Sequence, residues 1–277
     1  MTMPSELTRP HLDGRTLLSK VPEVTLFFWI IKVLCTTVGE TFADFINGKL
    51  GDNLNTTTAV MSALLAVALV GQFRARRYVP AIYWTSVVLI SVVGTLVTDN
   101  LVEHFDVTLT TSTVIFGALM LATFAAWFAS EKTLSIHSIH TAKREAFYWV
   151  AILFTFALGT AAGDLIAEKY SLGYFRSMLL FAGLIAVIAV AHLKFRLNAI
   201  LAFWAAYVLT RPLGASIGDL LSQPRTLAAG ADPTGFQAGL GLGTTVTSII
   251  FLTAILAVVV STMNDERRRT NVVRARD

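Results

Sequence analysis

Charged residues are scarce in this chain of 277 residues: Asp, Glu, Lys and Arg together make up 14% of it, whereas 55% is hydrophobic. The mean hydropathy of +0.65 is far above that of a water-soluble domain. Cys35 is the single cysteine, so the chain can form no internal disulfide bond and no cysteine-based zinc site. These scarcities exclude a soluble enzyme, a DNA-binding module and a disulfide scaffold, and they indicate an integral membrane protein.

The apolar residues form long runs that do not alternate with polar residues, as the strands of a membrane barrel would. A helix needs ~20 mostly apolar residues to cross a ~30 Å hydrocarbon core. The predicted fold class is therefore all-α, a polytopic membrane bundle of eight transmembrane helices. The expected spans are residues 24–46, 56–73, 79–101, 108–129, 146–166, 173–193, 198–221 and 239–262.

Positive charge is distributed unevenly around these spans. Sixteen Lys and Arg residues fall in the two tails and in the loops after the even-numbered spans, against four in the other loops. The positive-inside rule therefore predicts cytoplasmic tails at residues 1–23 and 263–277. In a membrane protein, an excess of Lys and Arg is explained first by the orientation of the helices in the bilayer. We therefore expect the lipid bilayer as a partner and do not expect the chain to bind nucleic acid.

One spacing recurs in every odd-numbered span: a Trp, a Gly ten residues later, and an Asp five residues after that. Four matches in corresponding spans indicate a fourfold internal repeat, with units at about 24–78, 79–131, 146–197 and 198–262. Ten extra residues in the central loop suggest two similar halves, each a pair of helical hairpins. The four copies are Trp29-Gly39-Asp44, Trp84-Gly94-Asp99, Trp149-Gly159-Asp164 and Trp204-Gly214-Asp219.

Two further segments accompany the repeat, namely Lys32-Val-Leu-Cys-Thr-Thr-Val-Gly-Glu-Thr-Phe-Ala-Asp44 and Arg144-Glu-Ala-Phe-Tyr-Trp149. With them, the chain resembles a bacterial family of membrane proteins built from four tandem two-helix repeats of unknown function. The resemblance covers essentially the whole transmembrane part. It implies four repeats of two transmembrane regions each, in a multi-pass protein that we expect in the bacterial inner membrane, but it supplies no substrate.

The repeats should place equivalent residues at equal depth, because each contains an even number of spans and enters the membrane in the same direction. Each Asp is expected ~22 Å farther out than its Trp. The four aspartates should therefore form one layer that faces the protein interior. On the first odd-numbered span, four polar residues share one helical face at a spacing of four, namely Lys32, Thr36, Glu40 and Asp44.

An ionisable group in the bilayer centre costs at least ~2.5 kcal/mol, so each one here requires a reason. Carboxylate and hydroxyl oxygens suit hard cations such as Mg²⁺ and Mn²⁺, which predicts a cation-binding or metal-coordinating site. Clustered carboxylates could also carry protons. The expected site comprises the acids Glu40, Asp44, Asp99, Asp164 and Asp219, the counter-charges Lys32 and Arg211, and the supporting residues Thr36, Thr37, Thr95 and Thr160.

Simpler roles exist for the same residues. The aspartates could cap helix ends near the interface, and the two bases could form purely structural ion pairs with acids. The repeated tryptophans are expected to pack or to anchor the helices at the interface, and the repeated glycines to allow close approach of helices.

The sequence predicts a transporter or exporter of a cation, with a divalent metal ion favoured and proton coupling left open. No Ser/His/Asp, Cys/His or HExxH arrangement is recognisable, so we expect no enzyme and no cofactor besides a transported ion. Two other classes remain: a cation channel with an aspartate ring, and a structural or partner-binding membrane subunit. The identity of the ion, the direction of transport and the oligomeric state stay open.

Overall fold

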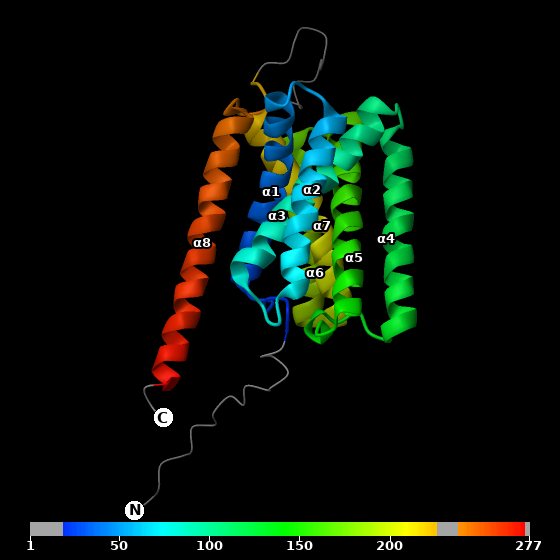
Figure 1. Ribbon diagram of the computed structural model, residues 1–277. Coiled ribbons are helices and arrows are strands. Elements are labelled where there is room, and N and C mark those ends of the chain that lie inside the picture. The colour runs from blue at the N-terminus through cyan, green and yellow to red at the C-terminus, as the bar shows by residue number, and fades with distance from the viewer. Residues whose placement is uncertain (1–18, 226–237, 275–277) are drawn as a thin grey trace, which may run out of the picture.

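The computed structural model describes residues 19–225 and 238–274, with side chains in 19–225 and 238–263. Most of the predicted tail 1–23 therefore lies outside the described residues, whereas the predicted tail 263–277 is helical as far as Arg274. The basic side chains of both tails, except that of Lys20, lie outside the described part. Within these described ranges, eight helices are long and apolar enough to cross a membrane, which confirms the all-α prediction. They are α1 (Leu26–Lys49), α2 (Leu54–Arg74), α3 (Pro80–Asp99), α4 (Leu109–Glu131), α5 (Ala142–Asp164), α6 (Tyr174–Phe195), α7 (Ala199–Ser222) and α8 (Gly243–Arg274) (Figure 1).

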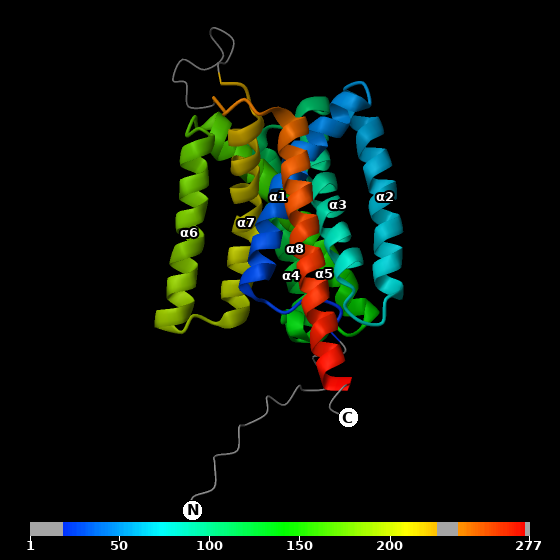
Figure 2. The same cartoon turned by 90° about the vertical axis from the view of Figure 1, so that its left-hand side faces the viewer.

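The odd-numbered helices form a closed inner ring. Helices α1 and α5 each pack against both α3 and α7, so α1 and α5 lie opposite each other across the ring. In the apolar stretch of each odd-numbered helix at least 56% of the residues are buried, against at most 22% in each even-numbered helix. The chain is thus a multi-pass membrane bundle in which the even-numbered helices form the outer layer (Figure 2).

The outer helices do not pack mainly against the inner helix of their own repeat. Helix α2 packs on α3, α4 on α5, and α6 on α7, while α8 packs on α1 and closes the circle between the two ends of the chain. The expectation of two halves made of compact helical hairpins is therefore wrong. Each inner helix has an apolar face that the preceding repeat covers, so the four repeats interlock.

Neighbouring inner helices approach most closely at the repeated glycines. A Cβ atom on Gly159 would overlap with the side chain of Arg211 on α7. The same relation holds around the ring, because each glycine faces the residue seven positions after the repeated Trp of the next inner helix. This confirms that the glycines allow close helix approach. The four pairs are Gly39 with Ser91, Gly94 with Phe156, Gly159 with Arg211 and Gly214 with Thr36.

An aromatic girdle closes the lower end of the ring, the end in Figure 1 where α1 begins and α8 ends. Three of the repeated tryptophans are buried and Trp29 is partly buried, so their packing role is confirmed. An aromatic residue precedes each of these tryptophans, and its ring contacts the Trp of the next repeat at 5.6 to 6.2 Å between centroids. The four contacts of the girdle are Phe28–Trp84, Tyr83–Trp149, Tyr148–Trp204 and Phe203–Trp29.

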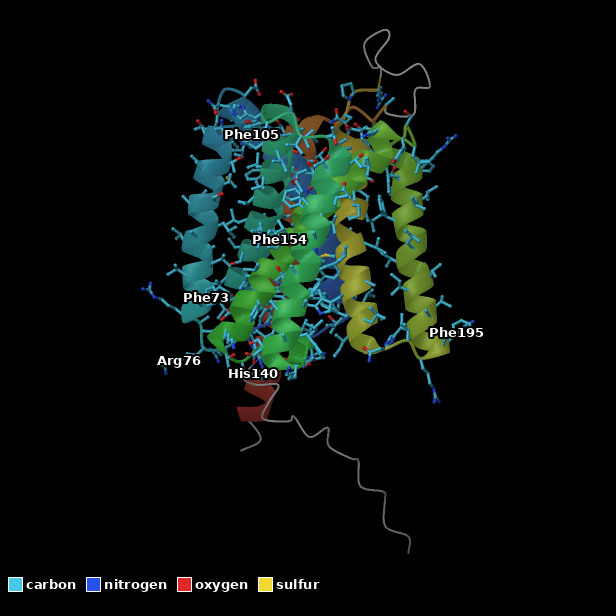
Figure 3. The ribbon with its side chains drawn as sticks, turned by 90° about the vertical axis from the view of Figure 1, so that its right-hand side faces the viewer. Phe73, Arg76, Phe105, His140, Phe154 and Phe195 are labelled. Atoms are coloured by element: carbon cyan, nitrogen blue, oxygen red, sulfur yellow. The ribbon has the colours of Figure 1, made fainter. Side chains whose placement is uncertain are left out.

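The segment before α1 is fastened across this lower end. The backbone carbonyl of Ser19 accepts a hydrogen bond from Tyr78 N (3.0 Å), and Lys20 N donates to the Ile139 carbonyl (3.3 Å). Both partners belong to loops between transmembrane helices. Residues 19–25 therefore form a strap that leads from those loops to the start of α1. Figure 3 shows this end of the bundle, with Phe73 and His140, opposite the end that carries Phe105.

Candidate functional site

The sequence-predicted acids gather toward the upper end of the inner ring, where each odd-numbered helix contributes one aspartate. Asp99 interacts electrostatically with Asp44, Asp164 and Glu40, and Asp219 interacts with the same three residues. Glu40 and Asp219 are buried, at 7% exposure each, and the other three acids are partly buried. We call this cluster the acidic layer; its members are Glu40, Asp44, Asp99, Asp164 and Asp219.

Arg211 lies directly below the acidic layer, fully buried at 0% exposure, and joins all four inner helices. From α7, its Nη2 donates to Glu40 Oε2 on α1 at 2.7 Å, which is a buried ion pair. Its Nη1 donates to the backbone carbonyl of Thr36 at 2.9 Å. The prediction that Arg211 serves as an internal counter-charge is therefore confirmed, with Glu40 as its partner.

The predicted supporting threonines divide into two groups. Thr160 Oγ1 accepts a hydrogen bond from Arg211 Nη2 at 2.7 Å, and Thr95 Oγ1 accepts one from the same nitrogen. The three side chains that bind Arg211 Nη2 occupy the same repeat position, immediately after the repeated glycine; they are Glu40, Thr95 and Thr160. One guanidinium therefore contacts equivalent positions in three repeats. The hydroxyls of Thr36 and Thr37 instead donate to the carbonyl of Val33 in their own helix, at 2.7 and 3.1 Å. The Thr36 hydroxyl also donates to the Thr210 carbonyl on α7, at 3.1 Å.

Lys32 lies elsewhere than predicted. Its Nζ has no hydrogen-bond partner, and no carboxylate in the described part of the chain forms an ion pair with it. The ammonium lies 3.9 Å from the ring centroid of Phe156 and 4.1 Å from that of Tyr207. The prediction that Lys32 neutralises an acid is therefore wrong, because its side chain points to the aromatic lower half of the ring, away from the carboxylates.

The acidic layer is not a preassembled metal centre. Within the described residues, no three His, Cys, Asp or Glu side chains lie close enough to hold one metal ion together. Metal coordination by the five acids therefore stays a prediction. No ion pair joins any of the four aspartates to a basic side chain in residues 19–225 and 238–263, so Arg211 pairs directly with Glu40 and acts on Asp44 and Asp164 only from a distance.

Two repeats distort their helices just after the repeated aspartate. Asp99 is followed by a π-helical turn over Asn100–His104, and Asp164 by one over Leu165–Lys169. Such turns are rare and occur frequently at functional sites. Repeats one and four continue there as regular helix. The upper rim of the acidic layer therefore departs from fourfold symmetry, because only the neighbouring helices α3 and α5 are distorted.

Sequence reasoning missed a second buried ion pair, at the lower end. Lys20 Nζ in the strap lies 2.6 Å from Glu145 Oε2 on α5 and donates to the Phe73 carbonyl at 3.0 Å. Gln72 Nε2 donates to the other oxygen of Glu145 at 3.1 Å. The girdle was also missed, although aligning the four repeats would have revealed the aromatic residue before each repeated Trp. For Lys20 no comparable signal exists.

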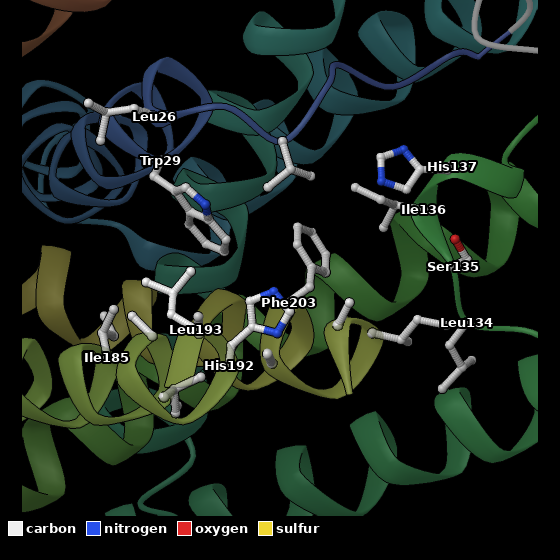
Figure 4. Close-up of a pocket in the computed structure, with 17 residues that line it drawn as sticks. Leu26, Trp29, Leu134, Ser135, Ile136, His137, Ile185, His192, Leu193 and Phe203 are labelled. Atoms are coloured by element: carbon white, nitrogen blue, oxygen red, sulfur yellow. The ribbon is translucent and has the colours of Figure 1, made fainter. Parts of the chain in front are cut away.

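A pocket of about 680 Å³ lies outside the acidic layer. It opens between α1, α6 and α7 near the lower end and is lined chiefly by apolar side chains, with Trp29, Phe203 and His192 facing it (Figure 4). None of the acids of the acidic layer lines it. The pocket is therefore separate from the charged centre of the ring.

These features define a class: a membrane protein of four two-helix repeats arranged around a central ring with acids at one end. The chain belongs to the family described as Repeat of Unknown Function (DUF347), whose model matches residues 27–78, 82–133, 147–198 and 202–267. This agrees with the suspected repeat family. Neither the comparison with curated proteins nor that with solved structures gave a match.

Proposed function

We propose that this protein transports cations across the bacterial inner membrane, with hard divalent ions such as Mn²⁺ and Mg²⁺ as cargo. The lower end then faces the cytoplasm, in agreement with the excess of Lys and Arg in the tails and even-numbered loops. The acidic layer is the cation-binding region and opens toward the outer side.

The acidic layer is the observation that carries this proposal. Four aspartates from four helices gather without an ion pair to a basic side chain in the described chain, and such a concentration of negative charge attracts cations. Carboxylate oxygens are the ligands that Mg²⁺ and Mn²⁺ prefer. Because no three acids among the described residues lie close enough to enclose an ion, the cargo is held with part of its hydration shell, as Mg²⁺ commonly is.

The lower half of the ring favours a carrier over an open channel. Arg211 crosses the ring immediately below the acids, and the aromatic girdle packs the ring beneath it. A cation could pass only after these contacts rearrange, which is the behaviour of an alternating-access carrier. An aspartate-ring channel would require a continuous aqueous path along this axis.

The proposal is tested by Mn²⁺ uptake into liposomes that contain the purified protein. Asp99→Asn and Asp164→Asn should each lower the initial rate at least about tenfold, a barrier change of ~1.4 kcal/mol. Asp52→Asn and Asp106→Asn are matched controls, because both residues are exposed at the same end and have positive φ values (54° each), which asparagine tolerates. Controls should transport like the wild type.

Two results would contradict the transporter. Folded Asp99→Asn and Asp164→Asn variants with unchanged uptake would remove the acidic layer from the pathway. Wild-type protein that moves neither Mn²⁺ nor Mg²⁺ above empty liposomes would favour the structural or partner-binding subunit.

A further inference from the structure

Lys32 occupies an unusual place on the axis of the inner ring. Its side chain is fully buried, at 0% exposure, and its Nζ has no hydrogen-bond partner in the part of the chain that the structure describes. Phe156, whose ring lies 3.9 Å from Nζ, belongs to α5, the helix opposite α1. The side chain therefore reaches across the centre of the ring, between the acidic layer and the aromatic girdle.

The charged and titratable groups near Lys32 are few. Cys35 on its own helix and Arg211 on α7 interact with it electrostatically, and the ring of Tyr207 on α7 lies beside the ammonium. From α3, α5 and α8, no charged side chain in the described residues forms an ion pair with Lys32. Its surroundings thus contain one full positive charge, that of Arg211, and no compensating negative charge.

A buried ammonium in this setting is only partly compensated. Contacts with the faces of two aromatic rings stabilise the charge, but burial without a carboxylate or a hydrogen bond opposes it. Arginine keeps its proton in proteins, whereas a buried lysine can release one. Lys32 is therefore the base on this axis that can exist both with and without its proton.

We propose that Lys32 is the proton-exchange site of the transporter and that it releases one proton when a cation occupies the acidic layer. This inference rests on the proposed function. Glu40 and Arg211 provide the link: a Glu40 carboxylate that turns toward the incoming cation leaves the guanidinium without its partner at 2.7 Å. The uncompensated positive charge then repels the Lys32 ammonium and favours its neutral form.

The proton has a path toward the lower end. One N–H bond of Lys32 breaks, the amine keeps the electron pair, and the proton passes along phenol oxygens to water at the lower end. The ring of Tyr207 lies 4.1 Å from the amine, and its hydroxyl, which has no hydrogen-bond partner among the described residues, must turn to accept the proton. The hydroxyls of Tyr83 and Tyr148 are hydrogen-bonded to each other in the same half of the ring. Each phenol accepts a proton and gives up its own, so none changes its charge.

The test counts protons per Mn²⁺ in liposomes that contain a pH-sensitive dye. The wild type should move one proton inward with each Mn²⁺ taken up, because the proton leaves Lys32 at the lower, cytoplasmic end, whereas Lys32→Met and Lys32→Arg should move Mn²⁺ down its gradient without protons. Lys49→Met and Lys49→Arg are matched controls, since Lys49 also lies on α1 near an aromatic ring, 5.6 Å from Phe45, but is exposed. If the role of Lys32 were purely structural, the Lys32→Arg variant would still move protons together with Mn²⁺, as the wild type does.

The outcomes separate the two proposals. Mn²⁺ uptake by the wild type without proton movement, or with the same proton count in folded Lys32→Met, overturns the role of Lys32 and leaves the transporter standing. Absence of wild-type Mn²⁺ uptake overturns both. If neither variant folds, calorimetry of Mn²⁺ binding to the wild type in buffers of different ionisation enthalpy still decides, because binding without proton release contradicts the proposal.

Discussion

Arg211 is the residue on which the inner helices converge. A buried ion pair contributes little net stability as a pair, but removing one member leaves the other charge uncompensated. The guanidinium also donates to Thr160 and to the Thr36 carbonyl, so its loss removes contacts with several helices at once.

Arg211→Gln should therefore lower the free energy of unfolding by ~3–5 kcal/mol. The double variant Glu40→Gln/Arg211→Gln should recover part of that loss, because no buried charge remains without a partner. Thermal unfolding in detergent measures both, with Arg76→Gln as an exposed control at the lower end (Figure 3). A loss for Arg211→Gln no larger than for Arg76→Gln would remove Arg211 from the centre of the fold.

A second residue-scale prediction concerns Glu145, which has 1% side-chain exposure beside Lys20. Glu145→Gln should destabilise the protein by ~3–5 kcal/mol because it leaves a largely buried ammonium without its carboxylate. Glu131, paired near the surface with Arg144 and Lys143, is the control, and Glu131→Gln should destabilise the protein far less than Glu145→Gln, because solvent screens surface ion pairs. Equal unfolding midpoints for the two variants would contradict a fastening role for the strap.

At the scale of the helices, the repeated glycines set the distance between neighbours in the ring. Gly159→Ala should destabilise the bundle by ~1–3 kcal/mol, because the added methyl group overlaps with Arg211 and Pro212. Gly183 on the outer helix α6 has no atom within 4 Å of the position of an added Cβ. Gly183→Ala should therefore be neutral or stabilising by up to ~1 kcal/mol. The reverse order of the two unfolding midpoints would refute this packing argument.

The elements differ in how far the sequence could predict them. The four Trp-Gly-Asp copies predict the inner helices and the depth of the aspartates, because helical rise converts spacing into position. Spacing along one helix does not determine which neighbouring helix a side chain faces. The prediction that Lys32 pairs with a carboxylate therefore failed, because the ammonium contacts the rings of Phe156 and Tyr207 instead. The π-helical turns after Asp99 and Asp164 also have no counterpart in the repeated pattern. They depend on local packing that the motif does not contain.

The whole molecule is a ring of interlocked repeats, and this arrangement was not predictable from the chain. Short connections such as Leu50–Asn53 allow α2 to pack on either neighbour, so only the tertiary structure decides between hairpins and interlocking. The contact of α8 with α1 depends on residues more than two hundred positions apart. Ser248 Oγ, for example, donates to Thr41 Oγ1 at 3.0 Å.

Closure of the ring gives a prediction at this scale. Cysteines introduced as Thr41→Cys and Ser248→Cys should form a disulfide under mild oxidation, because their side-chain oxygens are already in contact. Thr98→Cys with Ser248→Cys is the control pair, since Thr98 donates to carbonyls on α3 and α5. Mobility on non-reducing gels reports the crosslink. Efficient crosslinking of the control pair, or none of the first pair, would contradict the closed ring.

The central claim is that the four repeated aspartates act together as the cation site. Its most direct test is Mn²⁺ uptake into liposomes by the wild type and by a folded variant that lacks all four carboxylates, Asp44→Asn with Asp99→Asn, Asp164→Asn and Asp219→Asn. We predict saturable uptake by the wild type and none above empty liposomes for the variant. Equal uptake by both proteins, or no uptake by the wild type, would contradict the claim.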